Sequence, residues 1–352
     1  MSDKSWLAQL VRGATAGGRA SAANVGVHLT HNGIAAVRVR AAVPLPVVEE
    51  AREHSFEREH GPGAAVRALA EGGFLQGARV LLALPGGSYE ILPTSTPPAV
   101  PEEEMRDALR WQLRGSLQYP PEEAAFDFLR LPQRREAGSA SAPAAGMLVI
   151  AARRADVERV ATPLAAAGIA VEVVDIPEMA QRNLLGSGEG QTGCRGFLSF
   201  DQSSSLLTVQ LADELCFARR MQLPGYGSLN EEEPEHLADR VASNVQRSLE
   251  VFVRQSHLPD VTGLTVGAHV HASLFARAIQ EQAEVPTALF DPYMVVANAQ
   301  ALQVSLRDAE APMSGAMMLA LGVALRDHLG RNARPAATLG LPNWLLPWKK
   351  AA

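Results

Sequence analysis

The same order of secondary-structure patterns occurs twice along this chain, and this repetition restricts the possible folds more than any other feature. Residues 24–57 and 197–222 each alternate short apolar runs with turn signals, which is typical of strands in an antiparallel meander. Each meander is followed by a helical pattern, a strand, a second helix and a second strand. Alternating helices and strands favour crossover connections and parallel strand pairing. The sequence therefore predicts two α/β lobes of similar plan.

This plan resembles that of the actin-like ATPase fold, in which two ribonuclease-H-like lobes enclose a central cleft, and we expect this fold here. We expect a flexible N-terminal segment at 1–22 and a first lobe at 23–190 that contains an inserted subdomain. A second lobe is expected at 191–330 and a tail at 331–352. Low-complexity residues 133–146 predict a mobile loop within the first lobe.

The composition limits the chemistry. Hydrophobic residues make up 47% of the 352 residues and the net charge is −6, so the chain can bury a core and is a poor candidate for nucleic-acid binding. Lysine occurs only at Lys4, Lys349 and Lys350, which excludes a P-loop lysine or a Schiff-base lysine between them. Cys194 and Cys216 are expected to be reduced thiols. We expect neither a signal peptide nor a membrane-spanning stretch.

Three segments carry a family resemblance. In residues 88–132 an acidic helix ends in Trp-Gln-Leu-Arg at 111–114. The second segment is Asp-Ile-Pro-Glu at 175–178, and the third is a helix with Val-Gln-Arg-Ser-Leu at 245–249. Together with the order of elements from Val25 to Arg326, these motifs resemble the MshI family of MSHA-pilus biogenesis proteins. That family is similar to PilM of type IV pili and to the cytoplasmic domain of GspL.

The resemblance implies a cytoplasmic protein, peripheral at the inner membrane, that acts as a non-catalytic scaffold in pilus assembly. The expected partner is a PilN-like or MshJ-like inner-membrane protein, bound through its cytoplasmic segment. The assembly ATPase and a second copy of the chain are further partners that the resemblance leaves open. An ATP-binding switch of the same fold is the alternative function. A sugar-kinase-like or metabolite-kinase-like enzyme is a third, more distant one.

The resemblance also implies an Asp-Ile-Gly sequence in each of two phosphate-binding hairpins. In the first hairpin His28 stands where the aspartate is expected. A neutral imidazole is a poor ligand for Mg²⁺, which prefers oxygen ligands. Thr30 and Asn32 remain as side chains that could contact a phosphate.

The second hairpin and the adenosine strand also depart from the expected pattern. Ser199 stands where the second aspartate is expected, and Asp201 stands where the glycine is expected, with Ser203 in the turn. At the adenosine strand, Gly267 keeps the first of two expected glycines and Ala268 replaces the second. We therefore expect no catalytic residue, no metal and no resident cofactor, with Mg-ATP binding at these loops kept as the alternative.

Aromatic residues outside the cleft are candidates for partner binding. Trp111 is expected to pack at a lobe interface, with a partner-binding hot spot as the alternative. The tail combines apolar and basic residues, and its candidates are Trp344, Leu345, Leu346 and Trp348, followed by two lysines. This composition resembles the cytoplasmic segment of PilN-type partners. The tail could dock on the body, anchor at lipid headgroups or have no role.

Two pairs of titratable residues are expected to be structural. Asp175 and Glu178 flank Pro177, where a strand turns into a helix, and are expected to cap and pack. His269 and His271 form a His-x-His pair, for which a metal site needs a third ligand that the spacing does not supply.

Overall fold

The computed structural model describes residues 23–30, 32–57, 61–98, 100–132, 146–186, 193–201, 204–223, 234–256, 258–302 and 313–328. The N-terminal segment predicted at 1–22 and the tail at 331–352 lie outside these residues. Of the mobile loop predicted at 133–146, only Gly146 is described, and it begins a strand. The mobility of that loop and the boundaries near 190 and 330 therefore stay predictions.

The first half of the chain forms a five-stranded sheet in the order β3-β2-β1-β4-β8. Three strands form an antiparallel meander, and β4 and β8 extend the sheet in parallel from β1. Its helices α2 and α4 cover one face, where they share a hydrophobic cluster with β1 and β4. The bounds are β1 (Asn24–Leu29), β2 (Gly33–Arg40), β3 (Val47–Ser55), α2 (Gly63–Ala70), η1 (Glu71–Gly73), β4 (Arg79–Ala83), α4 (Arg154–Ala166) and β8 (Val171–Asp175).

The second half forms another five-stranded sheet, in the order β11-β10-β9-β12-β13. Each strand takes the position of its counterpart in the first sheet, so the predicted repetition of one α/β plan is confirmed. The bounds are β9 (Cys194–Phe200), β10 (Ser204–Leu211), β11 (Glu214–Gln222), α6 (Pro234–Ser256), β12 (Val261–Val266), α7 (Ala272–Ala283) and β13 (Thr287–Leu289).

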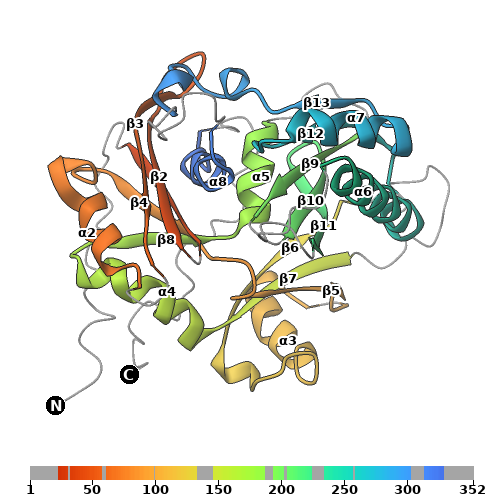
Figure 1. Ribbon diagram of the computed structural model, residues 1–352. Helices are drawn as coiled ribbons and strands as arrows, with labels where there is room; N and C mark the ends of the chain where they lie inside the picture. The colour runs from red at the N-terminus through yellow and green to blue at the C-terminus, as the bar shows by residue number, and fades with distance from the viewer. Residues whose placement is uncertain are drawn as a thin grey trace.

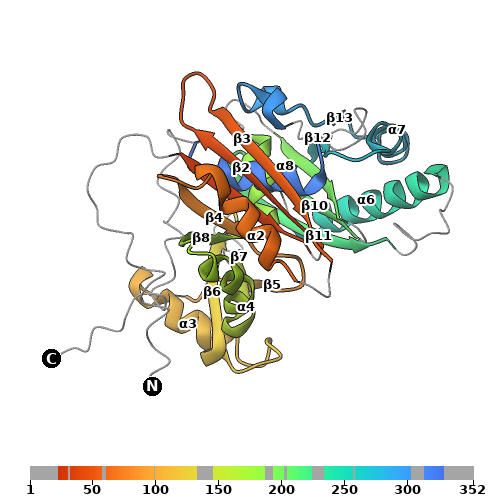
Figure 2. The ribbon, with the colours of Figure 1, turned by 60° about the vertical axis from the view of Figure 1, so that its left-hand side comes forward.

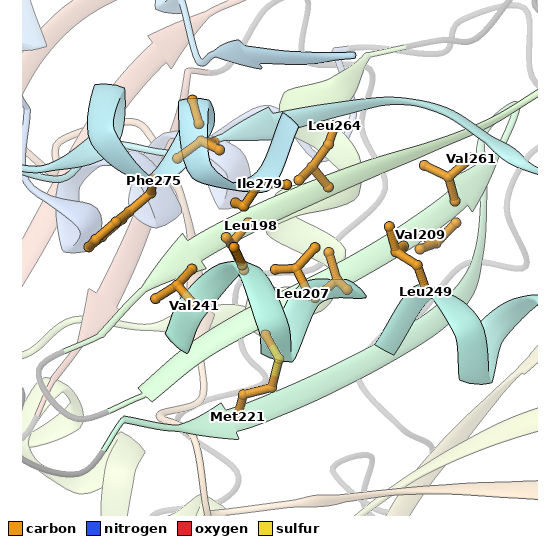
Figure 3. Packing of buried hydrophobic residues seen from close by; sticks show 14 of the residues in the cluster. Leu198, Leu207, Val209, Met221, Val241, Leu249, Val261, Leu264, Phe275 and Ile279 are labelled. Carbon is orange, nitrogen blue, oxygen red and sulfur yellow. The ribbon is translucent and has the colours of Figure 1, made fainter. Parts of the chain in front are cut away.

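Helices α6 and α7 cover the outer face of the second sheet. Alternate apolar residues of β9 and β10 share a hydrophobic cluster with these helices, and Leu198 and Leu207 point toward Val241 and Leu249 of α6 (Figure 3). Helix α6 places apolar residues at three-to-four spacing, which gives it a continuous apolar stripe. The opposite face of each sheet is left for contact between the lobes.

Two helices lie between the sheets, α5 (Pro177–Leu185) and α8 (Gly315–Ala324) (Figure 1). Both pack closely because small residues line their contacts. A Cβ atom on Gly26 of β1 would lie 2.2 Å from the carbonyl oxygen of Ala320. A Cβ atom on Gly322 would lie 2.4 Å from the carbonyl oxygen of Ala180. Helix α8, predicted to be buried, therefore lies directly on β1 of the first lobe and against α5.

A small subdomain is inserted between β4 and α4. Its antiparallel sheet has the order β5-β7-β6, and helix α3 covers one face through Met105, Leu109 and Leu113. The other face places Leu148 in a hydrophobic cluster with Met179 of α5 and Leu215 of β11. The bounds are β5 (Glu90–Ser95), η2 (Glu102–Glu104), α3 (Met105–Gln112), η3 (Pro121–Glu123), β6 (Ala124–Arg130) and β7 (Gly146–Arg153).

The prediction for Trp111 is wrong. This residue was expected to pack at a lobe interface, but 70% of its surface is exposed. Helix α3 packs on the subdomain sheet through Met105 and Leu109, its Gln112 accepts a hydrogen bond from the Thr94 hydroxyl, and the subdomain that carries it projects away from the second lobe (Figure 2). No second layer therefore covers the outer side of α3 within the described residues.

The segment after β13 connects the outer edges of the two sheets. It contains η4 (Pro292–Met294) and η5 (Ala299–Leu302). The Ala297 N–H donates to the Pro46 carbonyl at 2.8 Å, and the Val48 N–H donates to the Ala297 carbonyl at 3.2 Å. Among the helices that the structure describes, none is long and apolar enough to cross a membrane.

Candidate functional site

His28 lies at the end of β1 and faces the space between the lobes. Only 6% of its surface is exposed. Burial lowers the pKa of His28 to about 4, while the Asp201 carboxylate raises it and the Arg220 guanidinium lowers it. The imidazole is therefore neutral near pH 7. Its Nδ1 has no hydrogen-bond partner within the part of the chain that the structure describes.

Thr30 and Asn32 close the first hairpin. The Thr30 hydroxyl donates to Asn32 Oδ1 at 3.3 Å and to the Gly33 carbonyl at 3.1 Å. The Thr30 N–H also donates to the Gly33 carbonyl at 2.9 Å. These two candidate phosphate contacts thus hold the turn between β1 and β2.

Ser199 of β9 takes part in the hydrogen bonds that join α5 to the second sheet. Gln181 of α5 donates through Nε2 to Ser199 Oγ at 2.5 Å and to the Leu206 carbonyl at 3.1 Å. The Thr208 hydroxyl donates to Gln181 Oε1 at 2.6 Å. Gln181, Ser199 and Thr208 are all buried, so this network is internal. The residue at the second expected aspartate position is thus already engaged.

Asp201 follows β9 at the start of the second hairpin and is exposed. Its N–H donates to the Ser204 carbonyl at 2.8 Å, which closes the hairpin. Its carboxylate acts on the pKa of His28, so the structure brings these two residues of different lobes together. Ser203 lies outside the described residues.

The end of β12 is filled by protein side chains. A Cβ atom on Gly267 would lie 2.7 Å from Met318 Cε of α8, and the Ala268 N–H lies 3.3 Å from Met318 Sδ. His269 stacks on Phe275 with a centroid distance of 4.8 Å. Burial, with His271 beside it, lowers the pKa of His269 to about 4. The space next to Gly267 is therefore occupied by α8.

The two histidines after β12 lie in a turn before α7 and not on a strand. The His271 N–H donates to Nδ1 of His269 at 3.0 Å, so that nitrogen is engaged. Across the described ranges, no group of three histidine, cysteine or acidic residues could hold a metal ion.

Asp175 and Glu178 bind arginines from the second half of the chain. Asp175 Oδ2 accepts from Arg326 Nη1 at 2.6 Å, and this carboxylate is 2% exposed. Glu178 Oε2 accepts from the Tyr89 hydroxyl at 2.5 Å, and its Oε1 lies 3.6 Å from Arg220 Nη2. Burial raises the pKa of Glu178. The Asp-Ile-Pro-Glu motif thus connects α5 to β11 and to the end of α8.

A surface groove of about 510 Å³ lies on the second lobe, between α6, the start of β12 and the end of α7. Leu249, Val253, Val261 and Val285 form its apolar lining. None of the predicted site residues lines this groove. It is therefore separate from the cleft hairpins.

The cleft side chains do not fit Mg-ATP. Mg²⁺ is held through oxygen ligands, usually carboxylates. The two expected aspartate positions carry the neutral imidazole of His28 and the engaged hydroxyl of Ser199. The Asp201 carboxylate would repel phosphate, and Met318 lies against Gly267. No phosphate-transfer step is supported by these residues.

No family model matches the sequence, and no curated protein matches it. A chain of the PilM–PilN type IV pilus biogenesis complex is similar in structure, with a TM-score of 0.65 at 20% identity over 86% of this chain and 98% of that chain. The cytoplasmic domain of EpsL, an inner membrane component of the type II secretion system of Vibrio cholerae, has a TM-score of 0.47 at 12% identity. The match covers 86% of this chain and 95% of that chain. A Bacteroides thetaiotaomicron protein with an actin-like ATPase fold has a TM-score of 0.44 at 10% identity. The match covers 80% of this chain and 95% of that chain. The chain therefore has the two-lobed actin-like fold that the sequence predicted.

Proposed function

We propose that this protein is a non-catalytic scaffold of a type IV pilus assembly machine of the MSHA kind, as its resemblance to MshI implies. It acts in the cytoplasm, peripheral at the inner membrane, and binds the cytoplasmic segment of a PilN-like or MshJ-like membrane protein. The observation that carries the proposal is the similarity to a chain of the PilM–PilN complex, which extends over 98% of that chain. The assembly ATPase and a second copy of the chain are further candidate partners.

The cleft residues support a scaffold over a nucleotide-dependent switch. A switch needs a ligand that binds one state better than the other. His28 and Ser199 offer no carboxylate for Mg²⁺, and Met318 occupies the space beside Gly267. The usual ligand of this cleft therefore has no evident site.

The contacts between the lobes support the same conclusion. Arg326 binds the buried Asp175 from the second half of the chain, and Gln181 binds the second sheet through three hydrogen bonds. Breaking a buried ion pair costs about 3–5 kcal/mol. These direct protein contacts join the two halves of the body, which suits a protein that presents a constant surface.

The proposal is tested with a labelled synthetic peptide that carries the PilN-type sequence Asn-Leu-Leu-Pro followed by an aromatic or basic residue. We expect saturable binding in fluorescence anisotropy, with the same Kd in the presence and absence of Mg-ATP. A scrambled peptide of the same composition is the control. Equal binding of both peptides would contradict the scaffold role, and a Kd that changes with Mg-ATP would favour the switch.

A further inference from the structure

The outer side of α3 combines an exposed tryptophan with acidic side chains. Trp111 is 70% exposed, and the Asp107 side chain, one turn earlier on the same side, is 82% exposed. Glu103 and Glu104 precede the helix and are also exposed. The Arg114 guanidinium lies 4.5 Å from the Trp111 ring centroid. We refer to Glu103, Glu104, Asp107, Trp111 and Arg114 as the Trp111 face.

The charge of this face favours a basic, apolar occupant. Arg110 pairs with Asp107 at 3.1 Å, and its guanidinium also lies 5.4 Å from the centroid of the Phe126 ring. Glu103, Glu104 and Asp107 are all exposed, and they outnumber the single cation, Arg114, of the Trp111 face. They disfavour an anionic lipid surface and favour lysine or arginine next to apolar side chains. Tryptophan is enriched among the residues that contribute most of the binding energy at protein interfaces.

The last described helix ends beside this subdomain. Arg326, just after α8, binds Asp175 and also lies near Asp127 of β6. Burial raises the pKa of Asp127, whereas Arg106 and Arg326 lower it. Arg106 belongs to α3 and lies 2.7 Å from Asp127. Asp127 therefore lies between Arg326 at the end of α8 and Arg106 of α3.

The chain itself supplies a segment of the required chemistry. Residues 341–350 contain two tryptophans and three leucines, followed by two of the three lysines in the sequence. The 16 residues from His328 to Trp344 can extend over roughly 50 Å. The segment can therefore reach a surface next to the end of α8.

We propose that residues 341–350 bind the Trp111 face, with Lys349 and Lys350 beside its carboxylates and the apolar residues against Trp111. This contact covers the face until a partner of similar chemistry displaces the segment. It unites two sets of residues that the sequence singled out separately. It does not depend on the proposed function, because it concerns only this chain.

The small number of lysines makes a direct test possible in the full chain. A carbodiimide joins an amine to a carboxylate that it contacts, and beyond the N-terminus the only amines are Lys4, Lys349 and Lys350. We expect mass spectrometry to find Lys349 or Lys350 joined to Glu103, Glu104 or Asp107. The yield should not change with protein concentration. Cross-links to Glu250 or Asp260 of the second-lobe groove instead would overturn the proposal, and a yield that rises with concentration would assign the contact to a second copy.

Substitutions distinguish a specific contact from a chance one. Trp111→Ala should lower the cross-link yield by about tenfold or more, which corresponds to the loss of one anchor residue. The matched control is Met294→Ala, since Met294 is 74% exposed on the other lobe. Both variants should melt like the parent protein because neither side chain is buried. An unchanged yield in Trp111→Ala would refute the contact.

A peptide of residues 341–352 tests the same surface in trans. It should bind a chain that lacks these residues, bind the full chain at least about tenfold more weakly, and lose binding when both lysines are replaced by glutamate. Equal affinity for the two chains would overturn the proposal. The proposal also fails if the peptide binds neither chain but deletion of 341–352 abolishes binding to phosphatidylglycerol vesicles, since the segment would then be a lipid anchor.

Discussion

The two sheets share one strand order, but their cleft faces are built differently. On the first sheet, the backbone of α8 touches β1 directly, and Gly26 provides the space. On the second sheet, α5 makes polar contacts, in which Gln181 joins Ser199 and Thr208. The contact of α8 with β1 thus requires close packing at Gly26, whereas the contact of α5 with the second sheet contains a network of buried hydrogen bonds.

The two expected aspartate positions differ in the same way. His28 of the first lobe is buried with Nδ1 unpaired in the described structure, whereas Ser199 of the second lobe belongs to a complete network. A metal held between two hairpins needs ligands from both. Neither of these two positions therefore supplies a carboxylate for a metal between the lobes.

The close packing of α8 against β1 can be tested by a substitution at Gly26. Gly26→Val should lower the free energy of unfolding by more than about 3 kcal/mol, because its side chain would meet the backbone of α8, which cannot move aside. Urea denaturation measures the change. Gly63→Ala is the control, since its nearest neighbour lies 3.7 Å away at the flexible end of Arg67. A loss below about 1 kcal/mol at Gly26 would mean that α8 is not held against β1.

The burial of His28 predicts a pH dependence of stability. Because the pKa of His28 falls from 6.5 to about 4 on folding, the unfolded chain binds more protons between these values. Stability is therefore full above pH 6.5 and falls as the pH drops toward 4. At pH 4.5 the share from His28 is about 2.5 kcal/mol less than at pH 7. His28→Leu should reduce the measured pH dependence by this amount, and an unchanged slope would show that His28 is not buried as a neutral base.

The hydrogen bonds between α5 and the second sheet can be tested by a substitution at Gln181. Gln181→Leu should cost about 2 kcal/mol, because it leaves the hydroxyls of Ser199 and Thr208 buried without this partner. Gln282→Leu removes an exposed hydrogen bond to Ser243 and should change stability by less than about 0.5 kcal/mol. If the two variants melt alike, the network does not hold α5 on the second sheet.

The repetition of elements was readable from sequence because strands and helices leave local periodic patterns. Helix α8 was recognised as buried because it is apolar on all sides. Trp111 was predicted wrongly because the sequence of α3 does not indicate whether a second layer covers it. The partners of Asp175 and Glu178 could not be predicted, since Arg326 lies 151 positions away among 29 arginines. Gln181 left one weak signal, a polar residue on the buried side of a helix.

We propose that this cleft does not bind nucleotide, and thermal melting with and without millimolar Mg-ATP tests this proposal most directly. A ligand at 100 times its Kd stabilises the folded protein by about 2.7 kcal/mol, which is a shift of several degrees in Tm. We predict no shift for the native protein. A clear rise in Tm that disappears in Asp201→Ala would contradict the account.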